Sequence, residues 1–139
     1  MFNNILLAAD GSFHSYRAAE KAIELAKFVP HSYIEIVYVI DLNASKADVL
    51  NYSNPIQIEQ KRREKVEFIE KLAKKHGVRY VIKILRGEPG PSIVKYCNEN
   101  QFNLVIIGSR GLNVMQEMVL GSVSHNVAKR ANCPVMIVK

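Results

Sequence analysis

The stretch FNLVIIGSRGLNVMQEMVLGSVSHNV, residues 102–127, predicts a buried strand followed by a turn and then a helix. The unbroken apolar run of residues 104–107 is typical of a strand covered on both faces, as in a parallel sheet. Residues 108–111, GSRG, form a turn whose glycines can take positive φ and let another group approach the backbone closely. Nine residues later, Gly121 and Ser122 precede apolar residues at helical spacing, so we expect the helix to start there.

This stretch has two glycine corners, the turn at residues 108–111 and the helix start at Gly121 and Ser122, and both are suited to anions. Unpaired amides at a glycine turn and at a helix N-terminus attract negative charge, and the helix dipole adds to that attraction. Ser122 and Ser124 supply hydroxyl donors, and Arg110 supplies a positive charge. The pattern therefore predicts a phosphate cradle. The plainer interpretation is that the glycines only turn the chain and that Ser122 only caps the helix, and for each piece alone it is the better one.

Composition predicts one domain over residues 1–139. The chain has 139 residues, of which 48% are hydrophobic, and this is enough to bury a substantial core. Its first residues show no basic leader, and no apolar run approaches the roughly 18 residues that a membrane span needs. We therefore expect a cytoplasmic protein with no membrane association.

The two cysteines, Cys97 and Cys133, form no CxxC pair and are too few for a disulfide framework. They fit a reducing compartment, where each serves as a small buried hydrophobic residue. We expect neither of them to be catalytic.

The net charge of +6 raises nucleic acid as a possible partner. The densest basic segment, however, alternates with glutamates, as on a solvated helix face with i,i+4 pairs. Aromatic residues are not interleaved with the basic ones in a stacking pattern. A nucleic-acid partner is therefore unlikely on sequence grounds. The segment contains Lys61, Arg62, Arg63 and Lys65 beside Glu59, Glu64, Glu67 and Glu70.

The whole chain alternates strand and helix patterns, which predicts an α/β fold with a parallel sheet and helices on both faces. Pro55 can open one helix, and Gly77 is a typical stop for it. Residues 42–54 are long for a connecting loop, and a lid is one possibility. Glycines and prolines from Gly87 to Pro91 predict a turn before a short helix. The expected strands are residues 5–9, 33–40, 78–85, 104–107 and 134–138.

Ligands of such sheets bind beyond the carboxyl ends of the strands, where the strand order reverses. Asp10 and the turn at Gly108 both follow predicted strands. If the first and fourth strands are neighbours, Asp10 faces the glycine cradle across that crevice.

The spacing of GSRG at residues 108–111, nine residues, and then Gly121 and Ser122 resembles the G-x-x-G-x9-G-[ST] signature of the nucleotide-binding universal stress proteins. The resemblance extends to ILLAADGS at residues 5–12 and to CPVMIVK at residues 133–139. It implies an open five-stranded parallel sheet of order 3-2-1-4-5, similar to the adenine nucleotide alpha hydrolase fold. It also implies a site between the first and fourth strands.

The ligand implied by this resemblance is ATP, with a divalent cation such as Mg or Mn on its phosphates. Asp10 matches the aspartate that lies against the nucleoside, and Val39 matches a residue that frames adenine. The resemblance also implies a homodimer through the last strand, Val135–Val138, whose apolar edge is otherwise exposed. The implied nucleotide-binding residues are Ala9, Asp10, Gly11, Val39, Gly108, Ser109, Arg110, Gly111, Gly121, Ser122, Val123 and Ser124.

Few residues are candidates for catalysis. The sequence has no Walker lysine, and it assigns no second carboxylate to a metal. Asp41 and Asp48 are candidates only because their segment lies near strand ends, and a lone histidine such as His14 or His125 is more often a surface or capping group. We therefore expect no catalytic residue and no protein metal site.

The predicted function is a nucleotide-responsive regulatory protein of the stress response that acts through dimerisation or an unknown protein partner. Slow ATP hydrolysis is compatible with it. The alternative is a partner-binding or nucleic-acid-binding module that holds no nucleotide. A phosphoacceptor receiver domain fits poorly, because the third strand leads into Arg86, Gly87 and Glu88 rather than an aspartate.

Overall fold

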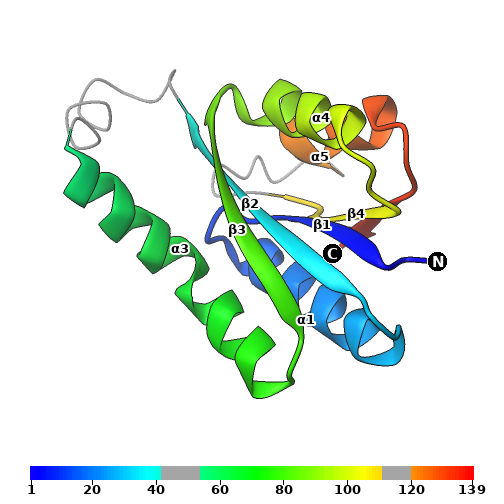
Figure 1. Cartoon of the computed structure of the whole chain (residues 1–139). Coiled ribbons are helices and arrows are strands. Elements are labelled where there is room, and N and C mark those ends of the chain that lie inside the picture. Colours follow the sequence, from blue (N-terminus) through cyan, green and yellow to red (C-terminus); the bar gives the residue numbers. More distant parts are fainter. Residues whose placement is uncertain (42–53, 111–119) are drawn as a thin grey trace.

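A computed structural model describes residues 1–41, 54–110 and 120–139, in which parallel strands alternate with helices (Figure 1). Each strand except β5 leads into a helix that returns the chain to the start of the sheet. The predicted lid lies in residues 42–54, almost entirely outside the described residues. The strands are β1 Asn4–Ala8, β2 Tyr33–Asp41, β3 Arg79–Gly87, β4 Leu104–Gly108 and β5 Val135–Val138. The helices are α1 Phe13–Phe28, α3 Pro55–Lys75, α4 Pro89–Glu99 and α5 Ser122–Arg130.

The sheet has the order β3-β2-β1-β4-β5, and all its strands run parallel. In the centre, Leu7 of β1 pairs with Ile36 of β2 on one side and with Ile106 of β4 on the other. The predicted order 3-2-1-4-5 is therefore confirmed. Because the chain builds outward from β1 in one direction and then from β4 in the other, the order reverses between β1 and β4.

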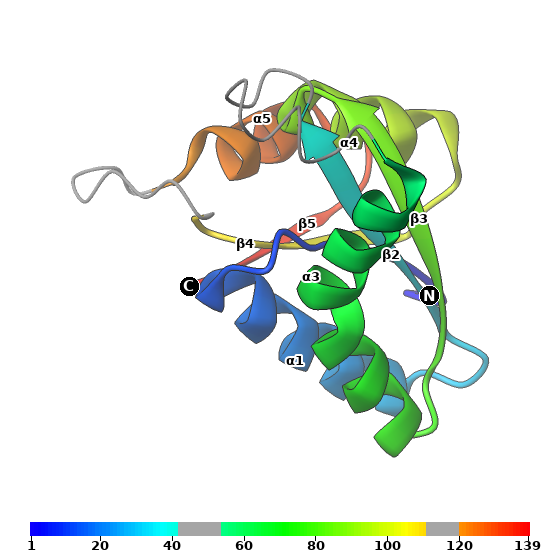
Figure 2. The same cartoon turned by 90° about the vertical axis from the view of Figure 1, so that its left-hand side faces the viewer.

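Helices cover both faces of the sheet, as predicted (Figures 1 and 2). Alternate residues of each strand point to opposite faces, so Ile106 packs in the core beneath α1 and α3, whereas Val105 packs in the core beneath α4 and α5. Both are completely buried. This two-sided burial explains why the strand segments are nearly continuous apolar runs.

Local capping chemistry sets the helix ends that the sequence predicted. Pro55 opens α3, and the side chain of Asn54 accepts a hydrogen bond from the amide of Ile56 at 2.9 Å. The same helix ends at His76, and Gly77 follows with φ of 65°, a left-handed conformation that glycine adopts without strain. Both expectations, the proline start and the glycine stop, are confirmed.

The segment around Gly90 differs from the prediction, because it belongs to α4 instead of a turn. Pro89 is tolerated there, since the first turn of a helix has no internal partner for its amide. Gly90 allows close packing of α4 on α5, where a Cβ at Gly90 would lie 2.7 Å from the side-chain nitrogen of Asn126. The glycine therefore serves helix packing and does not turn the chain.

Candidate functional site

The turn after β1 holds Asp10 in a fixed position at the carboxyl edge of the sheet. Asp10 Oδ1 accepts a hydrogen bond from the amide of Ser12 at 2.8 Å, and the Asp10 amide donates to Ser15 Oγ at 3.1 Å. Gly11, between them, has φ of 82°. Ser12 then caps α1 by accepting from the Ser15 amide at 3.1 Å. These bonds engage one carboxylate oxygen of Asp10, and within the described part of the chain no group donates to Oδ2.

Gly108 ends β4 beside the start of α1. A Cβ at Gly108 would lie 2.7 Å from the carbonyl carbon of His14 and 2.8 Å from its oxygen, so only glycine fits without a shift of the backbone. The expected close approach is therefore present, but the approaching group belongs to α1. Gly108 does not use the positive φ that glycine permits, since the described glycines with positive φ are Gly11, Gly77 and Gly87.

Ser109 joins the two glycine corners. Its carbonyl oxygen accepts hydrogen bonds from the amide of Gly121 and from Ser124 Oγ, both at 2.8 Å. The Ser109 amide donates to the carbonyl of Val138 in β5 at 2.7 Å. Ser124 is 2% exposed and also bonds to the Gly121 carbonyl at 3.0 Å. The hydroxyl of Ser124 therefore fixes the start of α5 against the end of β4.

The first turn of α5 presents backbone amides at this edge. Gly121 is the N-cap, without a side-chain capping bond, and Ser122 is the exposed first residue of the helix. The interpretation of Ser122 as the helix cap is therefore wrong. In the part of the chain that the structure describes, no acceptor receives the amides of Ser122, Val123 or Ser124, as is usual in the first turn of a helix. These amides, with the helix dipole, favour an anion.

The remaining predicted residues surround these corners. Ala9 is buried immediately before Asp10, and half-buried Arg110 follows Ser109. Val39, near the end of β2, is half-buried and packs against the core beneath α4 and α5. It is one strand farther from the glycine corners, since β1 separates β2 from β4. Gly111 lies outside the described residues.

Lys65 of α3 also reaches this edge, and the sequence interpretation missed it. Its aliphatic carbons lie against Gly11, and a Cβ at Gly11 would be 3.3 Å from Lys65 Nζ. Lys65 is half-buried and precedes the buried Val66, so it borders the apolar stripe of α3. A long side chain at such a border packs its stem on the protein and keeps its charge at the surface. The position of Lys65 beside the apolar stripe was therefore the sequence signal that could have placed it at this edge.

The other candidates for chemistry that the structure describes lie apart from one another. Asp41 is the last residue of β2, the exposed His125 donates its backbone amide to the Gly121 carbonyl, and Asp48 lies outside the described residues. The ring of His14 meets the edge of Phe13, with centroids 6.1 Å apart. Among the residues that the structure describes, no three His, Cys, Asp or Glu side chains are grouped as metal ligands.

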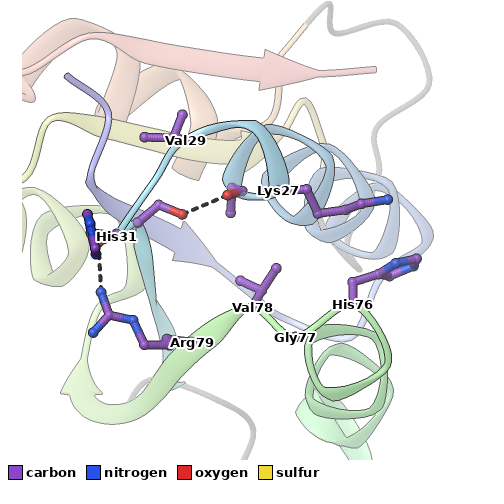
Figure 3. Close-up of a pocket in the computed structure, with 9 residues that line it drawn as sticks. Lys27, Val29, His31, His76, Gly77, Val78 and Arg79 are labelled. Atoms are coloured by element: carbon purple, nitrogen blue, oxygen red, sulfur yellow. Dashed lines mark hydrogen bonds between the residues drawn. The ribbon is translucent and has the colours of Figure 1, made fainter.

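A pocket of about 410 Å³ lies at the opposite edge of the sheet, between the ends of α1 and α3 (Figure 3). Four basic side chains line it: Lys27, His31, His76 and Arg79. Arg79 donates to the carbonyl of His31 at 2.8 Å. Basic groups at helix C-termini offset the negative end of the helix dipole, which accounts for this charge. The pocket contains none of the predicted nucleotide-binding residues, so it is not the site at the glycine corners.

The searched helices, those of the described ranges, include none that is long and apolar enough to cross a membrane. The fold and the corners together define an open α/β protein with an anion-attracting edge at the point where strand order reverses.

Within that class, the model of the universal stress protein family matches residues 1–139, and the chain belongs to this family. Universal stress protein YxiE of Bacillus subtilis is 33% identical over 150 residues, with 100% of each chain covered. The solved structure of MJ0577, a protein that is also among the curated relatives from Methanocaldococcus jannaschii, has a TM-score of 0.87 and 27% identity, and the match covers 100% of this chain and 96% of that one. A universal stress protein solved in complex with cAMP has a TM-score of 0.71 and 25% identity, and the match covers 99% and 96%.

Proposed function

We propose that this protein is an ATP-binding universal stress protein whose bound nucleotide regulates its association with other proteins. One observation carries the proposal: the Ser109 carbonyl holds the start of α5 directly against the end of β4. The unpartnered amides of α5 therefore lie at the crevice between β1 and β4, where open α/β sheets bind ligands. The relative in complex with cAMP supports an adenine nucleotide as the ligand class.

In this proposal, the phosphates lie on the amides of Ser122 and Val123, and the positive charge of Arg110 faces them. Asp10 and Val39 hold the nucleoside. A divalent cation such as Mg or Mn binds through the phosphates. The described residues fit that arrangement, because they supply positive charge and amides and include no group of three metal-ligating side chains. Gly108 lets the end of β4 lie against α1, and the Ser124 hydroxyl holds the start of α5 against the end of β4.

The proposed role is regulatory and not enzymatic. Rapid phosphoryl transfer requires an aligned nucleophile and ordered metal ligands. The described residues at this edge provide binding groups, while the hydroxyl of Ser124 is engaged by two carbonyls. ATP would then stabilise one conformation or one dimer surface of a cytoplasmic protein, with slow hydrolysis as a side reaction.

Dimerisation is proposed to use β5. Among the described strands, β5 pairs with β4 alone and lies at the edge of the sheet, and its Met136 is 38% exposed. An exposed apolar edge strand is a site for pairing with a second chain. Sedimentation at tens of micromolar protein should show a dimer, and a monomer alone would contradict this part of the proposal.

Calorimetric titration with ATP, ADP, AMP and GTP, with and without magnesium, tests the ligand. We expect binding of adenine nucleotides, and we expect Gly121→Val to abolish it by placing a branched side chain at the phosphate position. The backbone of Gly121, with φ of −69°, accepts valine. Ala131→Val is the matched control, because Ala131 caps the other end of α5 with φ of −68°. Unchanged binding in Gly121→Val would exclude the start of α5 as the phosphate position, and no binding by the wild type would favour the nucleotide-free module.

Lys65→Met tests the charge that α3 brings to this edge. We expect ATP affinity to fall about tenfold, which corresponds to ~1.4 kcal/mol, with a smaller effect on AMP because it has fewer phosphates. Lys71→Met is the control on the same helix, since the Lys71 side chain is 75% exposed and pairs with Glu67 at 3.3 Å. Equal affinities for the two variants would remove Lys65 from the site.

A further inference from the structure

Two thiols that are far apart in the sequence meet between α4 and the segment that enters β5. Cys97 Sγ of α4 lies 3.4 Å from Cys133 Sγ, across 36 positions of sequence, and both cysteines are free. A disulfide has its sulfurs about 2.05 Å apart. The remaining gap is small enough for side-chain rotation and a minor adjustment of the loop to close it.

Asn98 holds this pair in place. Its Nδ2 donates to the carbonyl of Arg130 at 3.1 Å, and its Oδ1 accepts from the amide of Asn132 at 2.8 Å. The residue after Cys97 therefore binds the backbone at two positions, three residues and one residue before Cys133. These two hydrogen bonds join α4 to the segment that carries Cys133. The contact between the sulfurs is therefore supported by neighbouring backbone bonds.

The two thiols differ in accessibility. Cys97 is 3% exposed within the core beneath α4 and α5, whereas Cys133 is half-buried and partly open to solvent. Burial first, and then the hydrogen bond with Cys133, raises the pKa of the Cys97 thiol to about 12. Cys97 therefore remains a thiol at neutral pH, and the more accessible Cys133 is the sulfur that a dissolved oxidant reaches first.

We propose that Cys97 and Cys133 form a redox-modification site that a hydroperoxide converts to an intramolecular disulfide. The Cys133 thiolate attacks one peroxide oxygen, the O–O bond breaks, and the leaving hydroxide takes up a proton to become water. The Cys97 sulfur then attacks the sulfenic acid on Cys133, the S–O bond breaks, and the hydroxyl leaves with the Cys97 proton as a second water. Two thiols are oxidised by two electrons, and hydrogen peroxide is reduced to two waters.

The disulfide would connect α4 covalently to the entrance of β5. The carbonyl of Pro134, the residue after Cys133, accepts a hydrogen bond from the Val105 amide at 3.0 Å, where β5 begins to pair with β4. Oxidation would therefore restrain the edge strand and the packing of α4 at the same time. The site is separate from the glycine corners, so its test does not depend on nucleotide binding.

The experiment treats the reduced full-length protein with hydrogen peroxide and follows intact mass and non-reducing peptide maps. We expect a loss of two mass units as two hydrogens leave, one crosslinked peptide pair joining Cys97 to Cys133, and reversal by dithiothreitol. Retention of both thiols under peroxide excess, or crosslinking only between chains, would overturn the proposal. Protein unfolded in urea is the control, and its intramolecular closure should be at least tenfold slower.

Single substitutions assign the two roles. In Cys97→Ala, we expect Cys133 to accumulate as a sulfenic acid that dimedone traps, without the loss of two mass units. In Cys133→Ala, we expect Cys97 to remain a thiol, because it is buried. Circular dichroism checks that each variant is folded. Dimedone labelling of Cys97 in folded Cys133→Ala would contradict the order of the two steps.

Asn98→Ala tests these two hydrogen bonds of Asn98 without changing either sulfur. We expect disulfide closure to slow by about tenfold while dimedone labelling of Cys133 rises, since the sulfenic acid then waits longer for its partner. Asn100→Ala is the matched control, because Asn100 bonds to the carbonyl of Tyr96 on its own helix. Equal closure rates in the two variants would exclude Asn98 as a positioning residue.

Discussion

The two faces of the sheet are both tightly packed, but they bury different chemistry. Beneath α1 and α3 the core is mainly aliphatic, and its buried side chains with a polar atom are Tyr38 and serines such as Ser15. Beneath α4 and α5 the core also contains Glu35 and Cys97. The second face therefore buries a carboxyl group, which needs hydrogen-bond partners, and a thiol, which the proposed disulfide would use.

Glu35 is the one carboxyl group among the described residues that is buried. The alternation of β2 turns it toward α4, where Tyr33 Oη donates to Oε2 at 2.5 Å and Tyr96 Oη donates to Oε1. Buried carboxyl groups are costly unless they are hydrogen-bonded, and these two phenols provide the bonds. Burial and then the hydrogen bond to Glu35 raise the pKa of Tyr33 from 10.0 to about 12.

The largest expected effect comes from the apolar face. Ile106→Ala should lower the free energy of unfolding by about 2–5 kcal/mol, because the side chain is completely buried and its removal leaves a cavity. Ile107→Ala, the neighbour that points to the other face, should give a loss of similar size. Urea denaturation measures both, with Phe28→Ala as the control, since Phe28 is 80% exposed. A loss below about 1 kcal/mol for Ile106→Ala would contradict tight packing on this face.

Glu35→Gln should cost less, about 1–3 kcal/mol, because charge-assisted hydrogen bonds in a buried site are weakened while the side-chain volume is kept. Glu99→Gln is the same change at the surface, where a side chain that is 61% exposed lies 4.0 Å from Lys95. It should stay within about 0.5 kcal/mol of the wild type. If the two variants were equally stable, Glu35 would not distinguish the second face from the first.

A smaller effect is expected for the aromatic contact between α1 and α3. The rings of Tyr16 and Phe68 have centroids 4.1 Å apart, and both side chains are partly exposed. A double-mutant cycle to alanine should give a coupling energy of about 0.5 kcal/mol, at the low end for aromatic pairs. The cycle that pairs Phe28 with Phe68 serves as the reference and should show none. Coupling above ~1.5 kcal/mol would mean that this edge of the apolar face contributes more than packing predicts.

The smallest expected effect is the dependence of the free energy of unfolding on pH that Tyr33 contributes on the face beneath α4 and α5. The folded protein keeps the Tyr33 proton up to a pKa of about 12, whereas the unfolded chain releases it near 10.0. The stabilisation is therefore complete below pH 10 and is lost as the pH rises toward 12. Urea denaturation across that window should show a shallower decline for Tyr33→Phe than for the wild type. Identical slopes would show that Tyr33 does not carry this dependence.

Most of the fold could be predicted because its signals are local. Buried strands appear as apolar runs, helices as periodic stripes, and α3 begins and ends at Pro55 and Gly77 as expected. The predicted neighbourhood of β1 and β4 was also correct. One local detail failed, the turn at Gly90, because a glycine can equally serve close packing, as it does at Gly90 and at Gly108. Sequence shows that a glycine is present but does not show which contact requires it.

The candidate site was only partly predictable for a related reason. The corners at Gly108 and Gly121 follow from spacing, while the Ser109 carbonyl that joins them and Lys65 above Gly11 do not. Lys65 looked like one more charge on a solvated helix. Its position beside Val66 at the border of the apolar stripe was the available signal, but only the packing of α3 against the sheet shows that Lys65 lies at the strand ends.

By itself, the sequence determined the order of the elements, their buried faces and the spacing of the glycine corners, because each of these depends on residues a few positions apart. Only the tertiary structure decided which distant groups meet. It encloses Glu35 between Tyr33 and Tyr96, and it brings Cys97 to Cys133 although the chain shows no CxxC motif. The physical reason is that the order of strands in the sheet and the packing of helices on its faces, rather than sequence separation, set these distances.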